Sequence, residues 1–267
     1  MQPSFRKHEP CPECGSKDNV GVWKNGIEHC FTPDCTYHVY KKGDDMELAQ
    51  TEKKQLSKGM LGDIPDRYIT EDTCRKYEVT LNGNKHFYPL FDEAGLHVAN
   101  KIRIVDKKDF YTEGSVAEGT LFGQKGCSEG GKYITLCEGE IDAMSAYQLL
   151  GSKWPVVSIK TGAASVTKDI GKSYDFLMSF DTVVICFDND DAGRKAAKKA
   201  AEMLSPKAKI MPMQYKDANE YLENKATQTF VNDWWSAKTY TPDGIIAGVE
   251  MWDTVMESVT ESAVHYP

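Results

Sequence analysis

Apolar runs of strand length alternate with helical patterns along the second half of this chain. The expected strands are residues 133–137, 156–159, 182–187 and 208–212, and the expected helical segments are 141–150, 166–180, 192–204 and 218–224. Because parallel strands need a long crossover, which is usually a helix, this alternation predicts an α/β fold with a parallel sheet. Ligand sites in such sheets lie beyond the carboxyl ends of the strands. We therefore expect the functional site at that edge.

Acidic residues follow three of these expected strands. They are Glu138, Glu140 and Asp142 after the first strand, Asp188 and Asp190 after the third, and Asp217 after the fourth. Carboxylates that converge on one edge repel each other unless divalent cations neutralise them, and oxygen ligands favour Mg²⁺ or Mn²⁺. Two such ions suit an in-line phosphoryl displacement. An isolated Asp-x-Asp is more often a helix cap. The prediction therefore rests on the ordered combination of a strand, Glu-Gly-Glu and a helix, followed by a strand, Asp-x-Asp and a helix.

Four of the eight cysteines form two pairs near the N-terminus, Cys11 with Cys14 and Cys30 with Cys35. An expected hairpin, residues 20–24 and 27–31 around an Asn-Gly turn, returns the second pair to the first. This arrangement predicts a zinc ribbon, and so short a segment would need the metal to fold. The second pair has four intervening residues instead of two. His38 therefore stays open as an alternative to a fourth cysteine ligand.

Polar and aromatic side chains cluster on this expected hairpin. Trp23, Lys24, Asn25 and His29 are of the kinds that stack on or hydrogen-bond to single-stranded bases. The alternative for Trp23 is that it covers a small core. Elsewhere, Cys137 and Cys186 lie inside apolar runs, where we expect buried thiols without chemistry.

The composition excludes several protein classes. The chain has 267 residues, a 40% apolar fraction and a net charge of −8, which is the profile of a globular protein and not of a uniformly basic nucleic-acid coat. No run of 18 apolar residues occurs, and residues 1–7 lack the apolar core of a signal peptide. We expect a soluble, unsecreted, cytoplasmic protein without a membrane partner.

Shifts in composition divide the chain into expected domains. Polar residues 44–62 are the expected linker between a cysteine module, residues 1–43, and a larger domain, residues 63–236. The larger domain is divided into an N-terminal basic subdomain, residues 63–131, and the sheet region, residues 132–236. In the expected tail, residues 237–267, apolar residues recur at helical spacing. We expect this tail to be mobile or to contact a partner, the alternative being that it packs on the sheet region.

Two motifs carry a family resemblance. Glu138-Gly139-Glu140-Ile141-Asp142 and the run from Phe187 to Arg194, FDNDDAGR, resemble the TOPRIM signature of primases, topoisomerases and some nucleases. With the cysteine module, residues 121–123, Ser165 in its Gly-Ala-Ala-Ser run, and residues 216–220, they resemble the primase half of the bifunctional primase-helicases of short-tailed phages and their mitochondrial relative. The resemblance implies a zinc-ribbon module followed by a TOPRIM-type catalytic domain. It implies the synthesis of short RNA primers on single-stranded DNA during replication.

The resemblance also implies roles for individual residues. Glu138 matches a metal ligand or general acid/base, and Asp188, Asp190 and Asp217 match metal-binding aspartates, with Asp142 a weaker candidate. Glu138, Asp188 and Asp190 are the implied catalytic set, with Mg²⁺ or Mn²⁺ as cofactor beside the structural zinc.

Residues 100–110 resemble the basic strand of the family. Lys101 and Arg103 alternate onto one strand face, and they and Lys107 are implied to bind nucleotide or template phosphates. The alternative is that basic side chains on an edge strand prevent aggregation.

Partners implied by the resemblance are single-stranded DNA, ribonucleoside triphosphates, a replicative helicase, fused or separate, and a DNA polymerase. Ile27 stands where the phage relatives have a template-reading histidine, so no template trinucleotide is carried over. Residues 126–133 fit G-x-x-x-x-G-K, but Tyr133 stands where the Mg²⁺-binding Ser or Thr belongs. The motif also precedes a strand instead of following one, so we expect a surface turn. Without a helicase motor, we expect a monomer. Two other functions stay open: a TOPRIM nuclease, and a non-catalytic zinc-ribbon DNA-binding protein.

Overall fold

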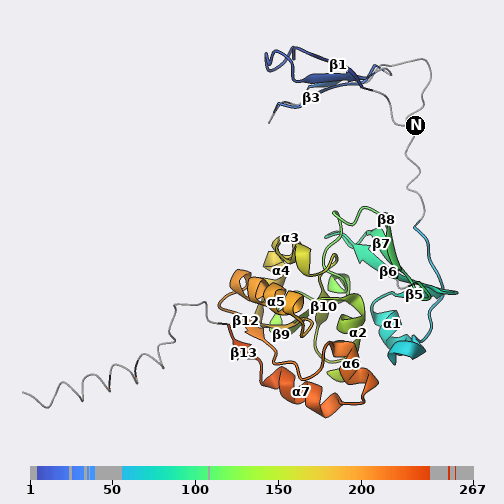
Figure 1. Cartoon of the computed structure of the whole chain (residues 1–267), viewed down its shortest axis with the longest axis vertical. Helices are drawn as coiled ribbons and strands as arrows, with labels where there is room; N and C mark the ends of the chain where they lie inside the picture. Colours follow the sequence, from blue (N-terminus) through green and yellow to red (C-terminus); the bar gives the residue numbers. More distant parts are fainter. Residues whose placement is uncertain are drawn as a thin grey trace, which may run out of the picture. The chain divides into compact units, whose positions relative to one another are not determined.

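The chain folds as two units, residues 1–55 and 56–267. The computed structural model (Figure 1) describes residues 5–23, 26–32, 35, 37–39, 56–107, 109–240, 252 and 256. The expected tail lies outside the described residues from 241 onward, apart from Trp252 and Met256, which are helical and exposed. In the part of the chain that is described, no helix is long and apolar enough to span a membrane.

The first unit is an antiparallel sheet of four short strands. These are β1 (Phe5–Glu9), β2 (Val20–Trp23), β3 (Glu28–Cys30) and β4 (His38–Val39), in that order across the sheet. The pairing of β2 with β3 confirms the expected hairpin, and Gly26 in its turn has φ +79°. The buried apolar core consists of Cys11, Val20, Val22 and Cys30. So small a core stabilises little by itself.

The main sheet of the second unit confirms the predicted parallel sheet. Its strands are β10 (Val156–Ser158), β9 (Gly131–Cys137), β11 (Phe180–Cys186), β12 (Ala208–Ile210) and β13 (Lys238–Thr239), in that order. The first four are parallel to their neighbours, while β13 is antiparallel to β12. Residues 237–240, expected in the tail, therefore lead into and form an edge of this sheet. A two-residue edge strand held by backbone hydrogen bonds leaves no apolar pattern in the sequence.

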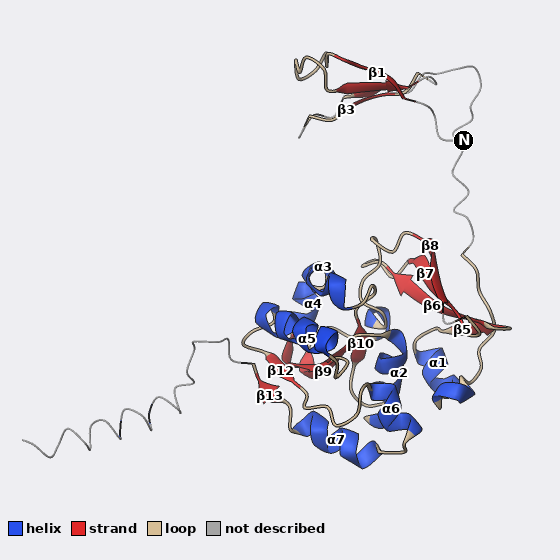
Figure 2. Cartoon of the chain, in the orientation of Figure 1, coloured by secondary structure: helices blue, strands red, loops and turns tan. Residues whose placement is uncertain are grey.

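Helices cover both faces of this sheet (Figure 2). The helices α2 (Glu140–Leu149), α6 (Ala218–Glu223) and α7 (Thr227–Trp235) contribute Met144, Tyr221 and Trp234 to one core cluster. On the other face, α3 (Val166–Lys172), α4 (Tyr174–Met178) and α5 (Asp191–Met203) contribute Ile170, Leu177 and Ala200. The expected helical stretch 166–180 is thus two helices that meet at Ser173.

The order of the strands places a ligand crevice between β9 and β11. The chain leaves β9 through α2 toward β10, and leaves β11 through α5 toward β12, in opposite directions along the sheet. The carboxyl ends of two strands that diverge in this way mark the topological switch point where open α/β sheets bind ligands.

The basic strand belongs to a second sheet, an antiparallel meander. It contains β5 (Thr80–Asn82), β6 (Lys85–Phe91), β7 (His97–Ile104) and β8 (Asp109–Gly114) in sequence order. A single turn of 3-10 helix (Pro65–Arg67) and α1 (Glu71–Lys76) precede it. Lys101 and Arg103 lie on β7, which is flanked by β6 and β8, so the alternative that they guard an edge strand is wrong.

The expected linker, residues 44–62, is described only in its second part. There Met60 pairs with Leu81, and Asn100 Nδ2 donates to the Ser57 carbonyl oxygen at 2.6 Å. Residues 56–62 are therefore fixed to the meander sheet. Polar composition did not distinguish such a segment from a linker, because backbone hydrogen bonds hold it. The rest, residues 44–55, lies outside the described residues.

Candidate active site

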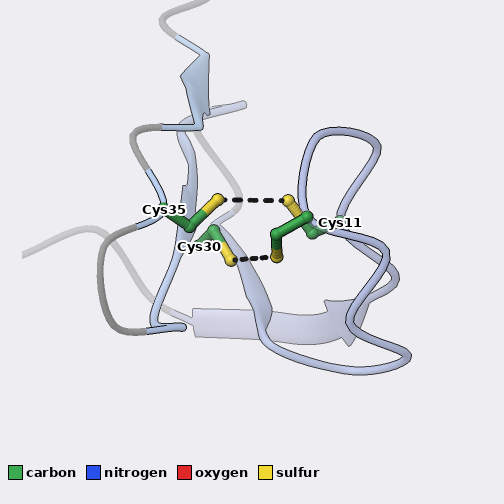
Figure 3. A group of neighbouring side chains, drawn as sticks. Cys11, Cys30 and Cys35 are labelled. Atoms are coloured by element: carbon green, nitrogen blue, oxygen red, sulfur yellow. Dashed lines mark hydrogen bonds between the residues drawn. The ribbon is translucent and has the colours of Figure 1, made fainter.

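Four cysteine sulfurs come together in the first unit (Figure 3). The Sγ atoms of Cys11, Cys14, Cys30 and Cys35 all lie within 4.8 Å of one another, with 3.6 Å between Cys11 and Cys35 and 3.7 Å between Cys14 and Cys30. A tetrahedral zinc ion with Zn–S distances of about 2.3 Å would hold its sulfurs about 3.8 Å apart. The donor set therefore fits zinc. It assembles without His38, whose side chain lies outside the described residues.

Two hydroxyls near Cys14 favour the thiolate that zinc binds. Hydrogen bonds with Ser16 and Thr32 lower the pKa of the Cys14 thiol to about 5, against a slight opposing effect of burial. The thiolate is the form of cysteine that ligates metals. Neither hydroxyl was singled out from the sequence.

The hairpin of the first unit carries an aromatic cluster. Trp23 lies 6.2 Å from Phe31 between ring centroids, and His29 meets Phe31 edge-on at 5.0 Å. A Cβ atom at Gly21 would come within 2.9 Å of both Trp23 and Phe31, so glycine makes room for these two rings. Phe31, exposed and missed from the sequence, extends the expected base-stacking surface. The other two expected residues, Lys24 and Asn25, lie outside the described residues.

In the second unit, the ends of β9 and β11 bring the predicted carboxylates together. Glu138 follows β9, Asp188 lies two residues beyond β11, and Asp142 lies in the first turn of α2. All three line one pocket of about 240 Å³. The opposite wall is Tyr88, Lys101, Arg103 and Phe110 from the meander sheet. The pocket thus joins carboxylates and cations, as phosphate chemistry with divalent ions requires.

Burial and mutual repulsion make these carboxylates hard to ionise. Burial raises the pKa of Asp188 to about 6, with further contributions from Glu138 and Asp217. Burial and Asp190 raise the pKa of Glu138, and burial and Asp217 raise that of Asp142. The five predicted acids therefore share one electrostatic field, although Asp190 and Asp217 do not line the pocket. A bound cation would relieve this repulsion.

Glu138 also carries an unsatisfied hydrogen-bond acceptor. Its Oε2 atom is buried and has no hydrogen-bond partner among the described residues. Buried polar atoms are almost always satisfied, and an exception in a group of carboxylates is what an oxygen-binding cation would fill. The acids therefore fit a divalent ion such as Mg²⁺ or Mn²⁺.

Asp190 and Asp217 each cap a helix as well. Asp190 Oδ1 accepts from the Gly193 backbone N–H at 2.8 Å at the start of α5, and Asp217 Oδ1 accepts from Glu220 at 2.8 Å at the start of α6. Each cap uses one oxygen of a two-oxygen carboxylate, so capping and ion binding are compatible. The α5 cap also requires Gly193, because a Cβ atom there would lie 2.1 Å from the Asp188 carbonyl oxygen.

Lys101 is committed to a buried ion pair. Its Nζ atom lies 2.9 and 3.0 Å from the two carboxylate oxygens of Glu140 and donates to the Lys160 carbonyl oxygen at 3.2 Å. The Glu140 side chain is only 6% exposed. Glu140, grouped with the acids in the sequence, lines the same pocket, but its charge is balanced by Lys101. Its partner could not be found from the sequence because the two residues are 39 positions apart.

Arg103 is the second basic residue of the meander sheet that lines the pocket, and it is not paired with Glu140. Its guanidinium lies 5.7 Å from the Phe110 ring centroid, and its Nε atom is buried without a hydrogen-bond partner among the described residues. Lys107 is exposed in the turn after β7 and does not line the pocket. The structure thus brings Lys101 and Arg103, but not Lys107, to the acids.

A second buried ion pair, missed from the sequence, holds the loop after β10. Lys160 Nζ lies 3.5 Å from Asp169, and both side chains are buried. Asp169 also accepts from the Lys160 backbone N–H at 2.8 Å. Gly162 in this loop has φ +76° and lines the acidic pocket. The ion pair therefore fixes one rim of the site.

Comparison with known proteins shows which family has a similar sequence and fold. The family model described as Toprim-like matches residues 135–222, which include all five predicted acids. The primase domain in a structure of the bacteriophage T7 lagging-strand DNA polymerase, with an RNA/DNA hybrid and dTTP, is 33% identical to this chain. It matches with a TM-score of 0.62 over 68% of this chain and 94% of that one. This chain belongs to the phage primase-helicase family.

Two further members of the family are similar to this chain over most of its length. A DNA helicase/primase of Enterobacteria phage T3 is 32% identical over 97% of this chain, and the chain spans 49% of that protein's length. The primase fragment of the bacteriophage T7 primase-helicase is 28% identical, with a TM-score of 0.60 over 87% of this chain and all of that fragment. The resemblance expected from the motifs is therefore confirmed, and the match is to the primase part of the family.

Proposed function

We propose that this chain is a DNA primase, a DNA-directed RNA polymerase that joins ribonucleoside triphosphates into short RNA primers on single-stranded DNA. The observation that carries the proposal is the pocket in which Glu138, Asp142 and Asp188 face Arg103. Family membership supports it, since relatives are named for primase activity. The chain spans about half the length of the phage T3 relative, so the activity of this part is the subject of the proposal.

In this proposal, Glu138, Asp188, Asp190 and Asp217 hold divalent ions, and Asp142 is a weaker candidate ligand. Bound Mg²⁺ or Mn²⁺ would lower the pKa of the primer 3′-hydroxyl and neutralise charge on the triphosphate. Glu138, Asp188 and Asp190 are the proposed catalytic carboxylates. Burial and neighbouring carboxylates raise the pKa values of Glu138 and Asp188, and this concentration of acidic groups supports a cation site at this edge.

The cations on β7 have different tasks. Arg103, whose guanidinium is always charged and has forked donors, is suited to hold phosphate oxygens. Lys101 neutralises Glu140 and so keeps a further negative charge away from the phosphates. In the first unit, zinc on the four cysteines would fix the hairpin, and Trp23 and His29, with Phe31, would stack on template bases.

The family also suggests partners. A replicative helicase, fused or separate, fits the name of the phage T3 relative, and a DNA polymerase fits the T7 complex. We propose that this chain acts with both in the cytoplasm of an infected host cell, and that the isolated chain is a monomer.

The proposal is tested by incubating the chain with single-stranded DNA, Mg²⁺ and four ribonucleotides, one of them labelled. A ladder of short labelled RNA products that requires the DNA is the expected result. Degradation of the DNA without RNA synthesis would indicate the nuclease alternative. Binding of the DNA with neither product would indicate a non-catalytic DNA-binding protein, and both of these outcomes contradict the proposal.

A further inference from the structure

A second pocket continues from the acidic pocket along β8. It has a volume of about 290 Å³ and shares Lys101, Phe110 and Gly162 with the acidic pocket. Its other walls include Tyr111 and Val116 on one side, and Thr161 of the loop after β10 on the other. The two pockets therefore form one groove. Carboxylates lie at one end, cations in the middle, and aromatic and aliphatic side chains at the other end.

Phe110 stands where the two pockets meet. Its side chain is 48% exposed although it is fully apolar. The register pairs Phe110 with Arg103 across β7 and β8, so both lie on the same face of the sheet. Lys101 Nζ lies 5.2 Å from the ring centroid and the Arg103 guanidinium 5.7 Å. The ring thus borders the charged part of the groove and the apolar part at once.

We propose that the second pocket binds the base of a ribonucleoside triphosphate whose phosphates lie in the acidic pocket, with Phe110 stacking on the base. The identity of this ligand rests on the proposed primase function. A nucleoside triphosphate presents the same order of chemistry as the groove, because an anionic triphosphate is followed by a ribose and a flat base. Aromatic side chains stack on any base, because every base has a π-face.

The loop after β10 offers this pocket few free polar groups that could select between bases. Lys160 Nζ donates to the Gly119 carbonyl oxygen at 2.5 Å and pairs with Asp169, and the Thr161 hydroxyl donates to Asp169 at 3.2 Å. The Lys160 and Thr161 side chains are thus engaged with the protein itself. The base is held by stacking, which suits a polymerase whose template selects the nucleotide. We expect ATP, GTP, CTP and UTP to bind with similar affinities.

Equilibrium binding of ATP and of inorganic tripolyphosphate to the full chain in Mg²⁺ tests the assignment. Phe110→Ala should weaken ATP binding by roughly 5- to 30-fold, since one base stack is lost. It should leave tripolyphosphate binding unchanged. Phe110→Trp should restore ATP binding, and Tyr174→Ala is the matched control, because Tyr174 is an exposed aromatic residue of α4 that lines neither pocket.

Three results would overturn the assignment. Equal weakening of ATP and tripolyphosphate binding would mean that Phe110 only positions Arg103 and Lys101. Unchanged ATP binding with weakened binding of single-stranded DNA would assign the pocket to a template base. A wild-type chain that does not bind ATP would also overturn it. The proposed function fails separately: a chain that binds ATP through Phe110 but makes no RNA contradicts the primase proposal and leaves the pocket assigned.

Discussion

Buried and half-buried carboxylates around the site differ in what balances their charge. Glu140 is balanced by Lys101, and Asp169 by Lys160, each at ion-pair distance. Glu138 has no basic side chain within ion-pair distance among the described residues, and one of its oxygens has no hydrogen-bond partner there. A buried polar atom without a partner is costly, so its presence at Glu138 points to a ligand that is bound there. This contrast is the residue-level reason to place the cation at Glu138.

His86, on β6 opposite Arg103, makes stability depend on pH. Its side chain is buried, and burial lowers its pKa; nearby Asp66 opposes this effect, and Arg103 and Arg67 add to it. The unfolded chain, with a histidine pKa of about 6.5, therefore takes up this proton more readily than the folded chain. Stability that is present above pH 6.5 is lost as the pH falls toward the lower folded value.

We predict that His86→Gln flattens this dependence. The wild type should lose more free energy of unfolding between neutral and mildly acidic pH than the variant does, since only the wild type must charge a buried imidazole. Denaturant unfolding of both proteins at the two pH values measures the difference. His97→Gln is a control, because the side chain of His97 on β7 is exposed. Equal losses in the wild type and His86→Gln would show that His86 does not contribute.

At the scale of elements, the ion pair of Lys101 and Glu140 joins β7 to the first residue of α2. Lys101→Met should lower the free energy of unfolding by about 3 kcal/mol, because it leaves the Glu140 carboxylate buried and unpaired. Adding Glu140→Leu should recover most of this loss. Urea unfolding of the two single variants and the double variant measures the coupling.

An exposed ion pair provides the matched control. Arg75 and Glu71 are paired on α1 with both side chains exposed, so Arg75→Met should cost little. If Lys101→Met costs no more than Arg75→Met, the buried pair does not hold the two elements together.

The edge strand β13 joins residues beyond 236 to the main sheet of the second unit. Lys238 and Thr239 pair with Ile210 and Lys209, and the Tyr240 hydroxyl donates to Glu202 at 2.9 Å. A chain that ends at residue 236 should therefore be less stable than one that ends at residue 240 by about 1–2 kcal/mol, from the lost backbone hydrogen bonds. Thermal unfolding of the two truncated chains compares them. Equal stability of the two truncated chains would show that residues 237–240 do not stabilise the sheet.

Elements with a strong period could be predicted from the sequence, and long-range partners could not. The strands β9 and β11 and the helix α5 follow from apolar runs and helical spacing, and the acids at the strand ends follow from their order. By contrast, the ion pair of Lys101 and the position of β7 between two other strands depend on which segments of the chain meet in the fold. The strand β13 has too few residues to show a period.

At the scale of the whole molecule, the two units should respond separately to loss of zinc. The apolar core of the first unit is very small, so metal binding should supply much of its folding free energy. Removing the metal with a chelator should therefore unfold the first unit and leave the second folded. Hydrogen exchange tests this: amides of β2 and β3 should lose protection while those of β9 and β11 keep it. Protection lost in both units, or in neither, would contradict the prediction.

The same treatment separates two parts of the proposed activity. A chain without zinc should lose initiation on single-stranded DNA but still extend a short RNA that is already annealed, because the acidic pocket belongs to the second unit. Rates of initiation and extension, measured with and without chelator and then with zinc restored, give the comparison. Equal loss of both would mean that the first unit does not act as the template reader.

The central claim is that the carboxylates at the ends of β9 and β11 carry RNA synthesis, and a matched pair of variants tests it most directly. Asp188 lines the acidic pocket, whereas Asp191, three residues later, has a side chain that is 91% exposed and pairs with Arg194. The measurement is the rate of RNA synthesis on single-stranded DNA by Asp188→Asn and Asp191→Asn, which make the same chemical change. Asp188→Asn should lower the rate by roughly 100-fold or more, through the loss of a metal ligand, while Asp191→Asn keeps the wild-type rate. Equal rates in the two variants would contradict the account.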